Sequence, residues 1–366
     1  MPLKASIHKR VFEFSFNART SRGAMKEKTS WFIKVWDSNN PAVIGIGESG
    51  PLPGLSPEHT PDLEATLEKL VSDINELSAP VPTTMNRDGL PKLIAQLIGT
   101  EMTSALPSFV FALETALLDL LNGGERIIFK TKFLTGQPIP INGLIWMGGL
   151  DFMLQQIELK IRDGFTCLKL KVGSHDFEKE CDVLQYIRRK YFRDKITIRL
   201  DANGAFRKEN ALDKLTDLYR FEIHSIEQPI RPGMVEMEEL CRQSPIPVAL
   251  DEELIGVYRS EDKRALLSRI KPKYIILKPT LHGGFFSCME WIRICEELGV
   301  GWWLTSALES SIGLNAIAQF TSQYNVSLPQ GLGTGMIYTN NIESPLTVEK
   351  GQLLYNKDVP WGQIEE

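Results

Sequence analysis

The stretch Ile198-Arg199-Leu200-Asp201-Ala202-Asn203 alternates apolar and polar residues and carries a charge where a β-strand is expected to end. Side chains two residues apart on a strand point to the same face. Arg199, Asp201 and Asn203 therefore share one side if the strand extends that far, and the leucine between them faces the other. The polar side needs polar partners, and the apolar side needs a covering helix.

Four further stretches end in the same way. They are Leu168-Lys169-Leu170-Lys171, Ser225-Ile226-Glu227-Gln228-Pro229, Val248-Ala249-Leu250-Asp251-Glu252 and Tyr274-Ile275-Ile276-Leu277-Lys278. The charges at 171, 201, 227, 251 and 278 lie 30, 26, 24 and 27 residues apart, about the length of one strand, one covering helix and their loops. This regularity predicts a parallel barrel with its charges gathered at one mouth.

The segments around these stretches complete the barrel. Residues 141–146 are expected to form its first strand, followed by a helix near 152–162; 301–306 and a short segment near 328–332 follow Lys278. The glycines at 331, 333 and 335 lack the lysine and the βαβ start of a phosphate-binding loop, so they predict a tight bend that closes the barrel.

The first part of the chain has a different pattern. Alternation in 11–16 and 31–36 predicts antiparallel strands that flank a basic loop over 17–29, and helical spacing follows in 60–77 and 108–121. Between them, 45–54 is rich in turn residues. We expect an α+β domain over 1–135, completed by about 337–366, and a barrel over 136–336. A chain of 366 residues has room for both.

Composition favours a small-molecule partner. A net charge of −5 and a pI near 5.7 give no reason to expect nucleic-acid or membrane-surface binding. No apolar run of eighteen residues and no signal-peptide core occurs, so we expect a soluble, cytoplasmic protein. The five scattered cysteines predict reduced thiols, and a homo-oligomer is left open.

Asp201, Glu227 and Asp251 are oxygen donors from three successive strands. Each alone is more typical of a solvated strand end or a salt bridge, but three at this spacing predict a cation site. Oxygen ligands without His or Cys favour Mg²⁺, with Mn²⁺ as a substitute. Lys171 and Lys278 approach the triad from opposite sides. We expect nearby cations to lower the pKa of each lysine enough to make it a base for a carbon acid, whose enediolate the metal stabilises.

Together, Lys169-x-Lys171, Asp201-x-Asn203, Glu227-Gln-Pro, Asp251-Glu252 and Lys278 resemble the muconate-cycloisomerase-like branch of the enolase superfamily. The resemblance implies an α/β fold in which an α+β capping domain covers a modified TIM barrel, (β/α)7β. It covers nearly the whole chain, because residues 47–58, Gly-Glu-x-x-Pro-Leu-Pro-Gly-x-Ser-Pro-Glu, are similar to the capping-domain segment of that branch.

Within the branch, residues 277–284 and 305–313 are most similar to the o-succinylbenzoate synthases. This implies a carbon–oxygen lyase that dehydrates 2-succinyl-6-hydroxy-2,4-cyclohexadiene-1-carboxylate to o-succinylbenzoate in menaquinone synthesis. By the resemblance, Lys171 removes the α-proton and then, as an acid, protonates the departing hydroxyl. Lys278 lies against the opposite face and stabilises the enediolate as a cation.

The resemblance also implies the substrate contacts. Lys169 is expected to contact the substrate carboxylate, Asn203 to lie at or just behind the substrate, and Ser306 with the backbone after it to hold the succinyl carboxylate. Arg199 either orients Lys171 and the metal ligands or forms a structural ion pair. The basic loop with Arg19, Arg22 and Lys26 either closes over the site or is a surface turn.

Three alternatives remain at this point. A racemase of N-succinylamino acids would use Lys171 and Lys278 as two bases, and a muconate-type cycloisomerase would use the same lysine as an acid. A non-catalytic barrel would not need the lysines and carboxylates. A histidine base is not supported, since His282 has no His-Asp pair beside it, and 331–339 lacks the Asp-x-Asp of dipeptide epimerases.

Overall fold

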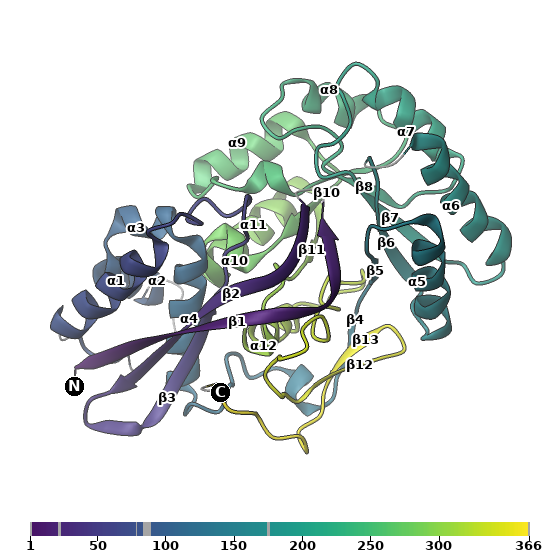
Figure 1. Cartoon of the computed structure of the whole chain (residues 1–366). Helices are drawn as coiled ribbons and strands as arrows, with labels where there is room; N and C mark the ends of the chain where they lie inside the picture. Colours follow the sequence, from purple (N-terminus) through teal and green to yellow (C-terminus); the bar gives the residue numbers. More distant parts are fainter. Residues whose placement is uncertain (1, 21–22, 78, 83–88, 174–175, 365–366) are drawn as a thin grey trace.

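The computed structural model describes residues 2–20, 23–77, 79–82, 89–173 and 176–364. Its chain folds into an antiparallel sheet with accompanying helices and a curled parallel sheet surrounded by helices (Figure 1). No helix in these ranges is long and apolar enough to cross a membrane.

The capping sheet has the order β1-β2-β3. Its strands are β1 Leu3–Thr20, β2 Gly23–Asp37 and β3 Asn40–Ser49, and its helices are α1 Leu63–Leu77, α2 Gly89–Ile98, α3 Thr100–Ala105 and α4 Pro107–Leu121. The expected strands and both expected helices are confirmed. Helix α4 is buried almost all round, because it lies between this sheet and the barrel helices.

The glycine-rich stretch at 45–54 is only partly a turn. Gly45 and Gly47 lie within β3, where a Cβ atom would come within 2.0 Å of the Ala116 carbonyl oxygen and 1.9 Å of the Ala112 carbonyl oxygen. These glycines allow α4 to approach the strand backbone closely, so their role is packing. Both a turn and a close approach of a helix favour glycine, which is why the sequence pattern suggested a turn.

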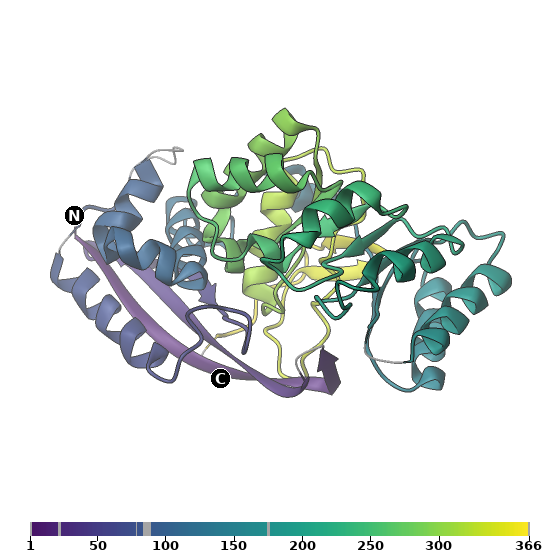
Figure 2. The same ribbon diagram turned by 90° about the horizontal axis from the view of Figure 1, so that it is seen from above.

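The prediction of a loop over 17–29 is wrong. Strands β1 and β2 continue as one long hairpin, with Ala18 opposite Met25 and Thr20 opposite Gly23. Strand pairing satisfies the backbone N–H and C=O groups of this polar segment, whatever side chains it carries. The ring of Phe16 lies 4.9 Å from that of Trp146 in the barrel. The hairpin therefore extends across to the barrel (Figures 1 and 2).

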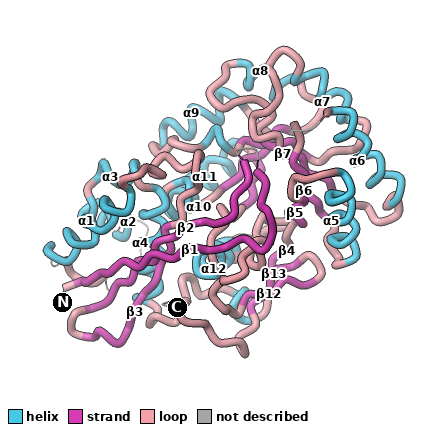
Figure 3. Tube along the Cα trace, in the orientation of Figure 1, coloured by secondary structure: helices cyan, strands magenta, loops and turns pink. Residues whose placement is uncertain are grey.

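The parallel sheet has the order β11-β10-β9-β8-β7-β6-β5, with helices around its outside (Figure 3). Its strands are β5 Gly143–Ile145, β6 Cys167–Lys171, β7 Thr197–Asp201, β8 Ser225–Glu227, β9 Val248–Leu250, β10 Tyr274–Leu277 and β11 Gly301–Leu304. The covering helices, in order, are α5 Leu150–Arg162, α6 Phe177–Lys190, α7 Ala211–Tyr219, α8 Glu236–Gln243, α9 Ser260–Ile270, α11 Gly284–Leu298 and α12 Ser311–Thr321, with α10 Pro279–His282 preceding α11.

An eighth segment closes the barrel. Gln330 bridges in parallel to Ile141, just before β5, and Gly331 bridges in parallel to Thr305, just after β11. The Gln330 side chain also accepts a hydrogen bond from the Leu304 N–H at 2.8 Å. The (β/α)7β barrel with a capping domain is thereby confirmed. The barrel closes at Gly331 as expected, but through extended backbone pairing rather than through a tight bend.

The C-terminal residues contact both parts of the molecule. Strands β12 Leu346–Glu349 and β13 Gln352–Tyr355 form a hairpin that pairs with β4 Ile139–Pro140. Tyr338 packs instead against Phe12 and Phe14 of the capping sheet. The domain boundaries at 135 and 336 stay predictions.

Candidate active site

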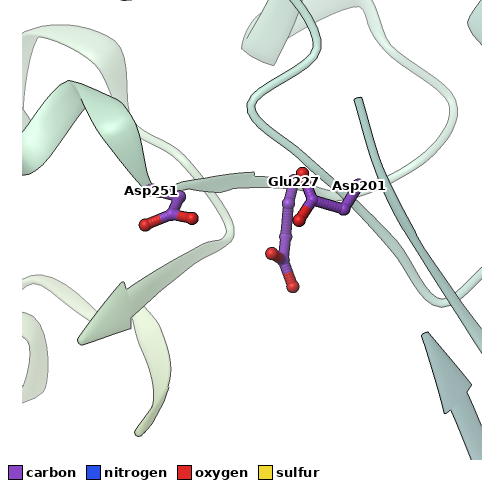
Figure 4. A group of neighbouring side chains, drawn as sticks. All are labelled: Asp201, Glu227 and Asp251. Carbon is purple, nitrogen blue, oxygen red and sulfur yellow. The ribbon is translucent and has the colours of Figure 1, made fainter. Parts of the chain in front are cut away.

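Three carboxylates meet at the carboxyl ends of neighbouring barrel strands. Asp201 ends β7, Glu227 ends β8 and Asp251 directly follows β9, so parallel pairing brings all three to the same end of the sheet, with Asp201 directly opposite Glu227. Their candidate ligand oxygens all lie within 4.8 Å of one another, and each residue is at most 1% exposed. Figure 4 shows the three side chains around a common space.

Each carboxylate has a lysine partner. Lys169 contacts Glu227 and lies 2.9 Å from Asp201 Oδ2, and Lys171 Nζ lies 2.8 Å from the same oxygen. Lys278 Nζ lies 2.5 Å from Asp251 Oδ2. The structure thus brings both predicted catalytic lysines and the three predicted ligands together, and the parity argument for Lys169 and Lys171 is confirmed.

The donor set fits a hard divalent cation. Glu227 Oε1 and Asp251 Oδ1 are buried acceptors without a hydrogen-bond partner among the described residues. Buried carboxylate oxygens need a proton donor or a cation. The cluster consists of oxygen donors alone, which favours ions such as Mg²⁺, Mn²⁺ or Ca²⁺ over zinc. These residues can therefore hold one divalent ion between them.

Burial and mutual repulsion dominate the electrostatics of the cluster. Burial raises the pKa of Glu227 to about 7, and Asp201 and Asp251 add to the shift although Lys169 opposes it. Burial also acts to raise the pKa of Asp201, but Lys169 and Lys171 outweigh it and the net shift is downward. The pKa of Lys169 is raised because Asp201 and Glu227 overcome the opposing effect of burial. Lys169 is thus protonated and shared between two carboxylates, which leaves Glu227 incompletely compensated.

The expectation that the pKa of Lys278 is lowered is wrong for this arrangement of side chains. Burial and the nearby Lys169 act to lower it, but Asp251 and Glu252 outweigh them and the pKa is raised. The sequence shows that Lys278 ends a strand but not that Asp251 Oδ2 lies at hydrogen-bonding distance. Lys278 is therefore a cation here, which is the role the resemblance assigns to it.

The raised pKa of Glu227 makes cation binding depend on pH. Below about pH 7 this carboxyl carries a proton that an incoming cation must displace, so affinity should fall as the pH falls. Well below pH 7 the loss approaches about tenfold per pH unit for one displaced proton. Calorimetric titration with Mg²⁺ between pH 8 and pH 5.5 measures this, and a constant affinity over that range would contradict it.

A cavity of about 130 Å³ opens beside the cluster. Lys169, Lys171, Asp201, Asn203 and Lys278 are among its lining residues. The other lining residues are Met25, Leu52, Pro53, Leu55, Asn142, Leu144, Trp146, Glu252, Thr305, Ser306, Ala307, Leu308, Gly331, Gly333 and Thr334. The cavity wall therefore combines the charged residues of the cluster with apolar and hydroxyl side chains, partly supplied by the capping domain.

Sequence reasoning missed several of these lining residues. Asn142 and Trp146 lie within the expected first strand, on either side of the observed β5, and Met25 lies on the hairpin taken for a loop. Among the expected basic residues there, Lys26 is exposed in β2, while Arg22 and the Arg19 side chain lie outside the described residues. Ser306 lines the cavity as expected, and its hydroxyl lies 2.6 Å from that of Thr334. The Ala307 N–H, expected to be free for an anion, instead donates to Glu309.

Side chains at the strand ends tie neighbouring strands together. Asn203, with a left-handed φ of 43°, accepts a hydrogen bond from Lys171 at 2.6 Å and donates to Glu252 at 2.9 Å. Gln228, with φ 36°, accepts from the Asp251 and Glu253 N–H groups, each at 3.2 Å. Asn203 thus orients Lys171, and Gln228 fixes the backbone that carries Asp251.

Arg199 and His282 lie behind the cavity. The Arg199 guanidinium packs over the ring of Trp303, 3.9 Å from its centroid, and donates to the Pro329 carbonyl at 2.6 Å. It is absent from the cavity wall, so this position does not support a substrate contact. His282 Nδ1 accepts from the Lys278 N–H at 3.1 Å, and burial lowers the His282 pKa to about 3. His282 is therefore neutral and supports the backbone of Lys278.

Comparison with known proteins gives a family. Residues 153–359 match the family described as enolase C-terminal domain-like. The o-succinylbenzoate synthase of Desulfotalea psychrophila is 44% identical over 358 residues, covering 93% of this chain and 95% of that protein.

Solved structures agree. The crystal structure of MenC from Desulfotalea psychrophila superposes with a TM-score of 0.86 at 40% identity, over 96% of this chain and 99% of that one. The L-Ala-D/L-Glu epimerase of Bacillus subtilis has a TM-score of 0.81 at 17% identity, over 99% and 97%, and shares the fold. The chain belongs to the enolase superfamily and, within it, to the family of o-succinylbenzoate synthases.

Proposed function

We propose that this protein is an Mg²⁺-dependent hydro-lyase that converts 2-succinyl-6-hydroxy-2,4-cyclohexadiene-1-carboxylate to o-succinylbenzoate in menaquinone synthesis. The observation that carries the proposal is the placement of Lys171 and Lys278 on separate carboxylates of one buried triad, facing one cavity. Family membership supports the choice of reaction.

Lys171 is the residue that we expect to move the proton. It takes the proton from the carbon next to the ring carboxylate, and the electron pair left behind delocalises into that carboxylate as an enediolate. The electrons then expel the hydroxyl group from the ring, which becomes aromatic. The proton on Lys171 Nζ leaves with the hydroxyl as water, so one group acts as base and then as acid.

The remaining charged groups stabilise the negative charge. When bound by Asp201, Glu227 and Asp251, a divalent cation acts as a Lewis acid that lowers the energy of a carboxylate carrying extra negative charge. Lys278, held protonated beside Asp251, faces the enediolate as a fixed cation, and Lys169 binds the substrate carboxylate. Asn203 orients Lys171 through its 2.6 Å hydrogen bond.

We assign the succinyl group to the part of the cavity wall that carries hydroxyl and apolar side chains. Ser306 and Thr334 place two hydroxyls there, 2.6 Å apart, and Leu52, Leu55 and Leu308 line the cavity. We propose that these hydroxyls contact the succinyl carboxylate while the apolar side chains cover its methylenes. The capping domain thus contributes to substrate selection.

An assay on the cyclohexadiene substrate tests the function. Dehydration is followed by ultraviolet absorbance with Mg²⁺, with EDTA and with EDTA followed by excess Mg²⁺, while N-succinylamino acids are examined in parallel by polarimetry. We expect dehydration that EDTA abolishes and Mg²⁺ restores. Racemisation without dehydration would move the function to the isomerase, and neither reaction would leave only the superfamily assignment.

The remaining expectations concern the setting of the enzyme. A cytoplasmic location and the domain boundaries stay predictions, and the oligomeric state stays open. The substrate is a small anionic carboxylate under this proposal.

A further inference from the structure

Glu309 is a buried carboxylate that joins two walls of the cavity from behind. One oxygen accepts a hydrogen bond from the Thr280 hydroxyl, two residues after Lys278. The other accepts from the Ala307 N–H at 2.7 Å, next to Ser306. Glu309 and Thr280 are both 0% exposed, and neither lines the cavity. A single side chain thus fixes α10, which directly follows Lys278, relative to the loop after β11.

The same loop is attached to the capping domain. Glu48, from β3, accepts hydrogen bonds from the Ser310 N–H at 3.0 Å and the Ser310 hydroxyl at 2.6 Å. The Tyr338 hydroxyl donates to the Leu308 carbonyl at 2.7 Å, and Leu308 has a left-handed φ of 62°. A non-glycine residue adopts this conformation only where its surroundings hold it there.

Lys28 lies beside this group of carboxylates. It belongs to β2 of the capping hairpin, is 2% exposed and donates to Ser30 Oγ at 3.2 Å. Ser30 in turn donates to Glu48 at 2.7 Å. Burial lowers the pKa of Lys28, while Glu48 and Glu309 act in the opposite direction. A series of hydrogen bonds thus leads from Lys28 through Ser30 and Glu48 to Ser310, and it connects the capping domain to the loop that carries Glu309.

We propose that Glu309 is a positioning residue for the dehydration reaction, which holds the Ser306 wall and the Lys278 wall at a fixed separation. The inference rests on the proposed function for its kinetic consequences, although the positioning itself can be measured without substrate. It makes the geometry of the barrel mouth depend on the docking of the capping domain, which holds the same loop through Glu48.

The first test is Glu309→Ala. Loss of both hydrogen bonds should raise KM at least about tenfold and lower kcat, since small misplacements of contact groups have effects of this order. Amide hydrogen exchange in residues 304–312 should become at least tenfold faster. Mg²⁺ affinity should stay within twofold, because no ligand is touched; a parallel loss of affinity would indicate general disorder and overturn the proposal.

A matched control is available in Glu114→Ala. Glu114 is also a buried glutamate that accepts a backbone N–H across the domain interface, from Phe285, but it lies away from the cavity. Its replacement removes a comparable interaction. We expect unchanged KM and unchanged exchange in residues 304–312; equal effects of the two variants would reduce Glu309 to a general stabiliser.

A conservative variant tests the hydrogen bonds directly and serves if Glu309→Ala does not fold. Glu309→Gln can still accept from the Ala307 N–H and donate to the Thr280 hydroxyl. Its KM and its amide exchange in residues 304–312 should therefore stay within threefold of those of the unaltered enzyme. A tenfold change of either quantity in Glu309→Gln would contradict positioning by these two hydrogen bonds.

The two proposals fail differently. An unaltered enzyme without dehydration activity refutes the function, whereas the exchange measurement still tests the positioning. An active enzyme whose Glu309→Ala variant has unchanged KM and unchanged exchange refutes the positioning alone.

Discussion

Replacing Lys171 with alanine is expected to abolish turnover while leaving a folded protein. Lys171 Nζ contacts Asp201 and Asn203 at the cavity wall, and no other described lysine occupies that position. A missing general base costs about 10²- to 10⁴-fold in rate. Folding should be retained, because Asp201 keeps Lys169 as a partner and Lys171 is only partly buried.

The measurement is kcat on the cyclohexadiene substrate at saturating Mg²⁺, with circular dichroism to confirm folding. Lys208→Ala is the control, since Lys208 also pairs with a carboxylate, Glu236, but on the surface. That variant should keep its full rate. More than about a hundredth of the activity remaining in Lys171→Ala would exclude Lys171 as the base.

Replacing Asp251 with asparagine should have the second largest effect, on cation binding. The change removes one negative charge from three and also the ion-pair partner of Lys278, leaving that cation beside the site. We expect at least about a hundredfold weaker Mg²⁺ binding, because loss of supporting groups behind a ligand already costs 10- to 100-fold.

Calorimetric titration at pH 8 measures this without substrate. Asp119→Asn provides a matched control, because Asp119 is a fully buried aspartate paired with Arg126 far from the cluster. Its Mg²⁺ affinity should stay within twofold. An unchanged affinity in Asp251→Asn would remove Asp251 from the ligand set.

The barrel and its charged mouth were predictable because they depend on spacing. Strand parity placed Lys169 with Lys171, and the repeat length placed Asp201, Glu227 and Asp251 at the same end of the barrel. Both rules follow from backbone geometry and need no knowledge of distant contacts. The observed cluster of three carboxylates is a direct result of this backbone geometry.

The capping domain was harder to predict because its features depend on contacts between distant segments. Polar residues in the β1–β2 hairpin indicate a loop until the barrel surface is known, and Gly45 and Gly47 indicate a turn until α4 is placed on them. The burial of Lys28 was equally hard to predict. The two carboxylates that favour its charged form, Glu48 and Glu309, lie 20 and 281 residues further along the chain.

The closure of the barrel at Gln330 and Gly331 has a consequence for biosynthesis. Until these residues leave the ribosome, β5 and β11 are open sheet edges, and unpaired edges favour association between chains. The packing of Tyr338 on Phe12 and Phe14 is completed only a few residues later. A nascent chain therefore exposes the edge at β5 from about residue 145 onward and the edge at β11 from about residue 304 onward, until Gln330 and Gly331 emerge. Both edges are open together over this last interval, so protection by chaperones is needed most just before Gln330 emerges.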